Sequence, residues 1–373
     1  MKFISAIILT SLSVLSIVSA PTKSLSQSST TCQQLMFGKL DEVKKLIQNG
    51  SNPNQICDFG SERFPLLHSV VASNDVNLAK LLIAKGADIK VRDSRGNTTL
   101  HHIAGSTELA KLLIDGGIDV NAKNNANITP IHNIYNQLTE EVAEILIAKG
   151  ANVNARSKGL LTPLHLALKP DIAELLINKG ADVNARSNQN FTPLHYATSR
   201  PKVAELLINR GADFNIINDR GTAVINDSSL RPEILQLLIA KGANVNFKTP
   251  DGKTPLHHHA TNPELTKILI AGGANVKNTD NLGRTPLHYA MGKPGMLLVA
   301  AGADINAKDN AGRTPIHTAV LAENYFPYDL VEFLITKKAK VNIRDNQGKT
   351  PLNLANSKAD RVMIKLLKPF CAI

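Results

Sequence analysis

Histidine is the residue type in this sequence that could most readily do chemistry, because a neutral imidazole can bind a metal ion or transfer a proton near neutral pH. The chain of 373 residues contains 11 histidines. Eight of them occupy one position of a recurring phrase, Thr-Pro-Leu-His or a variant of it: His68, His101, His132, His165, His195, His257, His288 and His317. Residues copied at a regular interval are spread along an array. The pattern therefore predicts an architectural role for them.

The run His257-His258-His259 is the strongest metal candidate, since clustered histidines can ligate an ion. Consecutive residues on a helix, however, point about 100° apart and do not share a face. We therefore expect no metal site at this run. We expect His258 to be exposed, and His259 stands where other repeats have a small alanine.

Motifs for other chemistry do not occur in the sequence. It contains no Gly-x-Ser-x-Gly, no Gly-x4-Gly-Lys-Ser/Thr and no His-Glu-x-x-His, and its three cysteines lack Cys-x-x-Cys spacing. Asp182, Asp213 and Asp304 copy a single turn position, so they do not converge as an acid/base pair would. We expect a protein without catalytic activity, cofactor or bound metal.

Each copy of the phrase predicts a short helix, followed by a second one. In Thr162-Pro163, the proline suits the first helical position and biases Thr162 toward the N-cap. The run Leu175-Leu176-Ile177 marks a buried second helix, which Lys179-Gly180 ends through a favourable charge and a left-handed turn. Residues 181–185 then predict an extended finger or hairpin.

These two phrases resemble ankyrin repeats, in which Thr-Pro-Leu-His opens the first helix and Leu-Leu-Ile-x-Lys-Gly-Ala-Asp-Val-Asn closes the second. The resemblance covers residues 32–370 and implies an all-α ankyrin-repeat solenoid of about eleven helix-turn-helix units with short β-hairpin fingers. It also implies that the repeated histidine hydrogen-bonds near the threonine and connects adjacent repeats. The repeats are expected to start near residues 32, 63, 96, 127, 160, 190, 220, 252, 283, 312 and 348.

The sequence departs from the family pattern in three ways. The seventh repeat, Thr222-Ala223-Val224-Ile225, lacks both proline and histidine, which predicts a looser or bent joint. The tenth repeat is longer through residues 323–328, which predicts a bulge. Prolines spaced 31 residues apart replace the usual glycine-containing turn and should start the second helix abruptly: Pro170, Pro201, Pro232, Pro263 and Pro294.

Residues 1–26 are interpreted as a signal peptide and polar tract. Lys2 carries the only side-chain charge before residue 21, and cleavage is expected after Ala20 or nearer Ser26. A membrane tether formed by an uncleaved N-terminal segment is the alternative. Export would place Cys32 and Cys57 in an oxidising compartment, where they could form a disulfide.

The candidate binding residues are those that the repeat does not dictate. The position after the histidine varies along the array, and Leu166, Tyr196, His258 and Tyr289 are expected to form a recognition patch on the concave face formed by the fingers and first helices. The alternative is that Tyr196 and Tyr289 pack inside their repeats. The fingers add further candidates: Arg156, Arg186, Asn188, Lys248 and Lys308.

These observations predict an exported, monomeric, non-catalytic protein that binds a protein partner. Like uncharacterised bacterial ankyrin proteins that it resembles, it could be an effector; a periplasmic scaffold or stabiliser of an exported enzyme is the alternative. A second alternative is a basic nucleic-acid binder, because the net charge is +11 and cations recur on the fingers. The scarcity of interleaved aromatic residues argues against it.

Overall fold

The computed structural model describes residues 30–59, 62–135, 138–322 and 328–370. The predicted signal segment, residues 323–327 of the predicted bulge and Cys371 lie outside this part of the chain. The contacts divide the chain into an N-terminal part, Met1–Ala185, and a C-terminal part, Arg186–Ile373. Each part is a stack of helix pairs.

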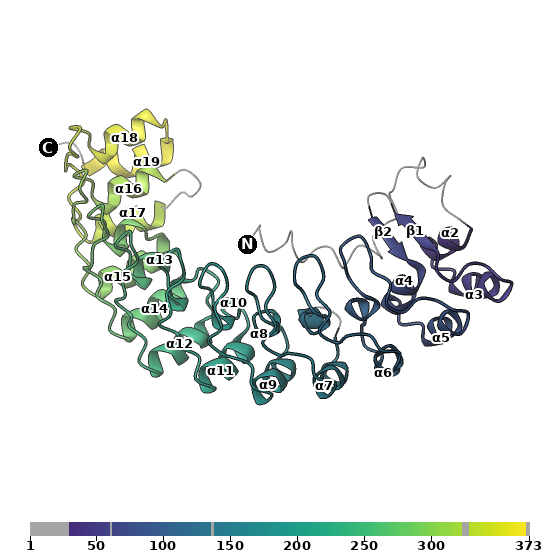
Figure 1. The fold of residues 1–373 in the computed structure, drawn as a ribbon. Helices are drawn as coiled ribbons and strands as arrows, with labels where there is room; N and C mark the ends of the chain where they lie inside the picture. Colours follow the sequence, from purple (N-terminus) through teal and green to yellow (C-terminus); the bar gives the residue numbers. More distant parts are fainter. Residues whose placement is uncertain (1–29, 60–61, 136–137, 323–327, 371–373) are drawn as a thin grey trace. The chain divides into compact units, whose positions relative to one another are not determined.

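In the N-terminal part, each repeat pairs a first helix beside the finger with a second helix farther from it. Figure 1 shows α5, α6, α7 and α9 following one another along one edge, with the fingers on the other side of the helices. The elements are α2 Thr30–Met36, α3 Leu40–Gln48, β1 Ile56–Phe59, β2 Glu62–Pro65, α4 Leu66–Ala72, α5 Val76–Ala84, η2 Thr99–His102, α6 Thr107–Asp115, η3 Pro130–Tyr135, α7 Glu140–Ala148, α8 Pro163–Leu166 and α9 Pro170–Asn178.

The C-terminal part repeats the same arrangement, and its second helices pack in sequence order. The all-α repeat fold expected from the sequence is confirmed in both parts. The elements are α10 Pro193–Tyr196, α11 Pro201–Asn209, η4 Val224–Asn226, α12 Pro232–Ala240, α13 Pro255–His258, α14 Pro263–Ala271, η5 Pro286–His288, α15 Gly292–Ala300, α16 Pro315–Leu321, α17 Tyr328–Thr336, α18 Pro351–Ser357, α19 Arg361–Leu367 and η6 Lys368–Phe370.

Where the Thr-Pro phrase occurs, it starts the first helix as the sequence predicts. In α8, Thr162 is the N-cap, Pro163 occupies the first turn, and the helix ends after four residues. Proline then begins the second helix at the first position of α9, α11, α12 and α14. In α15 the prediction is wrong, since the helix begins at Gly292, two residues before Pro294.

Aliphatic side chains of the second helices fill the core. In α9, Ile172, Ala173 and Leu176 are almost completely buried. Burying one large aliphatic side chain stabilises the fold by about 1.5–3 kcal/mol. The helix ends at Lys179, and Gly180 follows with φ of 87°, the left-handed conformation that glycine adopts without steric cost.

The fingers are mostly held by side chains and not by strand ladders. Among the described residues, regular strands occur only in the first finger, where β1 and β2 pair antiparallel, and one isolated bridge joins Arg92 and Thr98. Elsewhere a polar side chain closes the turn, as in Asp280, whose Oδ1 accepts the N–H groups of Leu282 and Arg284 at 2.9 Å. The expected hairpins are therefore compact loops in most repeats.

A disulfide joins Cys32 of α2 to Cys57 of β1, with 5.3 Å between the two Cα atoms. Both cysteines are buried. The bond connects the first helix of the array to the first finger. Among the described residues, the first repeat packs against one neighbouring repeat, and the cross-link adds a covalent connection to that packing.

The seventh repeat contains a packing defect. The structure moves the expected alignment by one residue: Ala223, and not Thr222, is the N-cap, so Ala223 takes the place of threonine and Asn226 the place of histidine. A cavity of about 160 Å³ is lined in part by Ala223 and Ile225. The side chain of Asn226 is buried, and its amide oxygen and nitrogen have no hydrogen-bond partner. The packing is looser here, because alanine and asparagine do not form the hydrogen bonds of a threonine-histidine pair.

Removing the disulfide should destabilise the N-terminal end selectively. The bond closes a separation of 25 residues, for which loop-closure entropy gives about 3 kcal/mol. In the double variant Cys32→Ala, Cys57→Ala, amide hydrogens of α2 and α3 should exchange faster with solvent. Amides of α7 serve as the internal control, and equal acceleration in α7 would contradict a local role.

Restoring the repeat phrase in the seventh repeat should stabilise the protein. The double variant Ala223→Thr, Asn226→His would add the helix cap and replace the unsatisfied amide of Asn226 by an imidazole that accepts the N–H of the cap residue, and we expect the free energy of unfolding to rise by about 1–2 kcal/mol. Urea denaturation measures the change. The single variant Ala223→Thr is the control for the cap alone, and a less stable double variant would show that the position of Asn226 does not admit the imidazole.

Candidate functional site

In several repeats the repeated histidine links two consecutive repeats through both ring nitrogens. Nδ1 of His101 accepts the backbone N–H of Thr98 at 3.0 Å, so the ring proton lies on Nε2, which donates to the carbonyl of Ile128 at 2.9 Å. The same inter-repeat bonds run from His132 to Leu161, His257 to Arg284, His288 to Arg313 and His317 to Lys349. These histidines are structural, as the family resemblance implied.

Burial keeps these imidazoles neutral. It lowers the pKa of His101 to about 4, despite the hydrogen bond to Ile128, which acts in the opposite direction. A general base needs a pKa near the working pH and access to a substrate. His101 is 4% exposed and has neither property.

The three consecutive histidines contact different neighbours. His257 reaches Arg284 of the next repeat, and Nε2 of buried His259 bonds the carbonyl of Ile225 in the preceding repeat at 2.9 Å. The prediction that His258 is exposed is wrong. Its side chain is half-buried, and its Nε2 is shielded from solvent without a hydrogen-bond partner. Burial, together with the neighbouring His259, lowers its pKa to about 4.

Tyr289, directly after the repeated histidine, lies between two cations. Its hydroxyl donates to Oδ2 of Asp280 at 2.6 Å. The guanidinium of Arg284 lies 4.6 Å from the ring centroid and the ammonium of Lys253 lies 5.4 Å from it. Its hydroxyl is thus fixed inside the repeat, while its half-buried ring and the two cations form part of the surface.

Tyr196 occupies the same position in the sixth repeat, and it too has an engaged hydroxyl group and a half-buried side chain. Its hydroxyl is hydrogen-bonded to Ser187 of its finger, and its ring stands edge-on to Phe191 with centroids 6.1 Å apart. For both tyrosines, the alternative prediction of packing inside the repeat holds for the hydroxyl group, while the residue as a whole is only half-buried. Leu166 is half-buried at the matching position of α8 in the N-terminal part.

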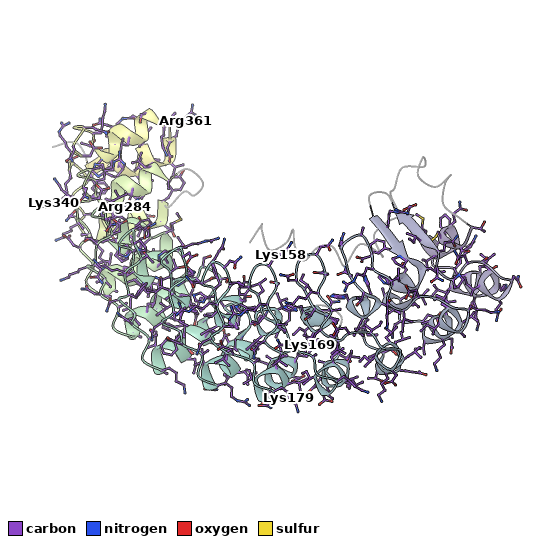
Figure 2. The ribbon with its side chains drawn as sticks, viewed as in Figure 1. Lys158, Lys169, Lys179, Arg284, Lys340 and Arg361 are labelled. Carbon is purple, nitrogen blue, oxygen red and sulfur yellow. A yellow bond between two sulfur atoms is a disulfide. The ribbon has the colours of Figure 1, made fainter. Side chains whose placement is uncertain are left out.

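The other predicted binding residues are exposed on the fingers: Arg156, Arg186, Asn188, Lys248 and Lys308. Several finger cations also connect neighbouring fingers. Lys248 donates to the carbonyl of Thr279 at 3.2 Å, and Arg92 donates to that of Lys123 at 2.9 Å. In Figure 2, Lys158 marks a finger on one side of the N-terminal part and Lys179 marks the opposite edge.

A column of cations was not predicted from the sequence. The residue before the threonine is basic in four consecutive repeats, and Figure 2 marks one of the four, Arg284. They are Lys253, Arg284, Arg313 and Lys349. The same position holds Asn97, Ile128 and Leu161 in earlier repeats. Alignment of this position would have shown the change, but only the structure brings Lys253 and Arg284 to the ring of Tyr289. We call Lys253, Arg284, Arg313, Lys349 and Tyr289 the cation column.

Stacked helix pairs with projecting fingers define a helical repeat protein. A family model described as ankyrin repeats (3 copies) matches residues 32–124, 103–187, 131–218, 222–309 and 295–371. The chain therefore belongs to the ankyrin repeat family. Among curated proteins, a putative ankyrin repeat protein of Acanthamoeba polyphaga mimivirus is 38% identical over 66 residues, which are 18% of this chain and 8% of that protein. The similarity thus covers a small part of either protein.

Among the helices of the described ranges, none combines the length and the apolar composition needed to cross a bilayer.

Stability should fall as the pH is lowered from 7.5 to 5. The folded-state pKa of His101 is about 4, whereas an unfolded histidine titrates near 6.5. The stabilisation is therefore complete above pH 6.5 and is lost toward pH 4, by about 1.4 kcal/mol per pH unit for each such histidine. Urea denaturation at several pH values measures the slope.

The variant His101→Asn provides a matched control, since the last repeat already uses asparagine. There Thr350 donates its N–H to Oδ1 of Asn353 at 3.0 Å. The variant keeps the helix cap, loses the link to the next repeat and cannot titrate. It should show a shallower loss of stability between pH 6.5 and 5, and an unchanged slope would show that His101 does not contribute.

Proposed function

We propose that this protein is an exported, non-catalytic binding protein that holds an acidic segment of another protein on the finger and first-helix face of its C-terminal part. Ankyrin repeats generally mediate protein–protein interaction. The observation that carries the proposal is the half-buried ring of Tyr289 between Lys253 and Arg284. Tyrosine and arginine are enriched among residues that contribute most to binding energy.

The charge on this face supports an acidic partner. The cation column places four basic side chains at one position of consecutive repeats, and the whole chain carries a net charge of +11. Arg284 is paired with Asp280, whose side chain is only 1% exposed, so this pair holds the guanidinium in place. A fixed cation loses little side-chain entropy on binding a carboxylate.

Binding to protein is favoured over binding to nucleic acid. A nucleic-acid track needs cations that are available to phosphates along the fingers. In this protein Arg92, Lys248 and Arg344 donate to finger carbonyls, so part of the finger charge stabilises the array. The cluster of Lys253 and Arg284 at the ring of Tyr289 is local, which suits a short peptide segment.

The apolar N-terminal sequence and the disulfide between Cys32 and Cys57 support export, because disulfides persist in oxidising compartments. An exported binding protein can act on host proteins as an effector or serve a periplasmic enzyme as a scaffold. We propose the effector role, and the identity of the captured partner distinguishes the two.

A charge-reversal pair tests the binding face. The variant Lys253→Glu, Lys349→Glu changes two members of the cation column, whereas Lys202→Glu, Lys267→Glu makes the same change in net charge on exposed positions of α11 and α14. Each protein is used for affinity capture from the organism's exported fraction and from a host extract, with quantitative mass spectrometry. We expect the first variant to retain at least about tenfold less of the partner, equivalent to about 1.4 kcal/mol, and the second to retain it fully.

The melting temperature of both variants is measured as a control for folding. Equal loss of the partner in both variants would indicate nonspecific charge attraction, and equal retention would place the binding face elsewhere. Recovery of the mature protein in the cytoplasmic fraction would contradict export. A partner from the exported fraction and none from the host extract would favour the scaffold role.

A further inference from the structure

The second repeat contains a buried imidazole with a free lone pair. Pro65 occupies the place where other repeats have threonine, and proline has no N–H to donate to the histidine three residues later. As a result, Nδ1 of His68 is buried without a hydrogen-bond partner. Nε2 bonds the carbonyl of Val91 at 3.1 Å. Since a carbonyl can only accept, the ring proton lies on Nε2, and Nδ1 presents its lone pair.

Two further side chains that can ligate a metal lie beside His68. Nε2 of His102, on η2 of the third repeat, lies 3.0 Å from Oδ2 of Asp93 in the finger between them. The rings of His68 and His102 have centroids 4.8 Å apart. One ligating atom from each of these three residues lies within 4.8 Å of the others.

We propose that His68 Nδ1, Asp93 Oδ2 and His102 Nε2 form a Zn²⁺ site. Zn²⁺ binds imidazole nitrogen and carboxylate oxygen at about 2.0–2.2 Å, and a tetrahedral arrangement places such ligands about 3.3 Å apart. The pair formed by Asp93 and His102 already has this spacing. Closing the site around the ion reduces the largest separation by about 1.5 Å, which is within the reach of side-chain rotation.

The surroundings of the three ligands have the features of a metal site. A ligating histidine commonly donates its other N–H to a backbone carbonyl, as His68 does to Val91. Oδ1 of Asp93 is held by the N–H groups of Arg95 and Asn97 at 2.8 and 2.9 Å, which fixes the direction of Oδ2. The side chain of His102 is 19% exposed, so this side can admit the ion and a water molecule as the fourth ligand.

The ninth repeat offers an internal contrast at the same positions. Asp280 corresponds to Asp93, but its partner is Tyr289, which is a poor ligand for Zn²⁺. The histidine of the preceding repeat, His257, has its Nδ1 occupied by the N–H of Thr254 at 3.0 Å. The ninth repeat therefore forms a hydrogen-bonded cluster at positions where the second and third repeats supply three ligands.

The bound ion would connect the second repeat to the third. His68 belongs to α4 of the second repeat, Asp93 to the finger that follows α5, and His102 to η2 of the third repeat. The second repeat lacks the threonine that caps the first helix in most other repeats. We infer that Zn²⁺ stabilises this junction in place of that hydrogen bond.

The untagged, full-length protein is first treated with a chelator to remove bound metal, and its binding of Zn²⁺ then tests the site. Isothermal titration should show one Zn²⁺ per chain, Co²⁺ should give the visible absorption of a tetrahedral site, and the melting temperature should rise with Zn²⁺. Two variants remove the site without opening a cavity. Pro65→Thr supplies the missing N–H to Nδ1 of His68, and His102→Tyr copies the hydrogen bond between Tyr289 and Asp280.

Both variants should remain folded by circular dichroism and should bind Zn²⁺ at least about a hundredfold more weakly, the upper range for the loss of a supporting residue at a metal site. The control variant His317→Asn changes a structural histidine of the tenth repeat and should bind Zn²⁺ as the wild type does. Absence of Zn²⁺ binding by the wild type would overturn the proposal. Unchanged affinity in folded Pro65→Thr and His102→Tyr would do the same, because the ion would then bind elsewhere.

Discussion

The structure depends on a hydrogen-bonded histidine that joins consecutive repeats along much of the array. An isolated helix of four residues such as α8 is not stable in water, because nucleation costs more than so few hydrogen bonds return. The threonine-histidine pair satisfies the free N–H groups at the start of the helix, and the other ring nitrogen reaches the backbone of the following finger. The same ring thus caps a helix and connects one repeat to the next at a fixed spacing.

Deviations from this interaction mark the places where the molecule has unusual properties. In the second repeat, Pro65 cannot donate, and a buried nitrogen of His68 is left free. In the seventh, Ala223 and Asn226 replace the threonine and the histidine; Ala223 lines a cavity, and the amide of Asn226 is unsatisfied. A regular array makes such departures easy to interpret, because each has intact copies of the same position for comparison. The hypotheses about metal binding and local packing both rest on that comparison.

The proposed binding face consists of positions at which the residue type differs from repeat to repeat. The position after the histidine holds Tyr289, whose hydroxyl is engaged inside the repeat and whose ring lies beside Arg284 and Lys253. A side chain at this position is therefore both anchored and accessible. Anchoring reduces the entropy lost on binding, which makes such positions suitable for recognition without disturbing the stack.

The sequence by itself determined the fold class, the two-helix repeat and the structural role of the histidines, because helix caps, prolines and glycine turns act locally on the backbone. It left open whether Cys32 and Cys57 pair, and it misjudged His258, which is half-buried. Burial depends on what neighbouring repeats bring to a side chain, and no local pattern states this.

The tertiary structure alone decided which residues from different repeats meet. His68, Asp93 and His102 are far apart in the sequence and carry different repeat positions, so no motif spacing unites them. Stacking places the finger that carries Asp93 against the first helices of the second and third repeats. This geometry brings the three ligands together. Local chemistry in the sequence thus fixes each repeat, while packing between repeats creates the candidate sites.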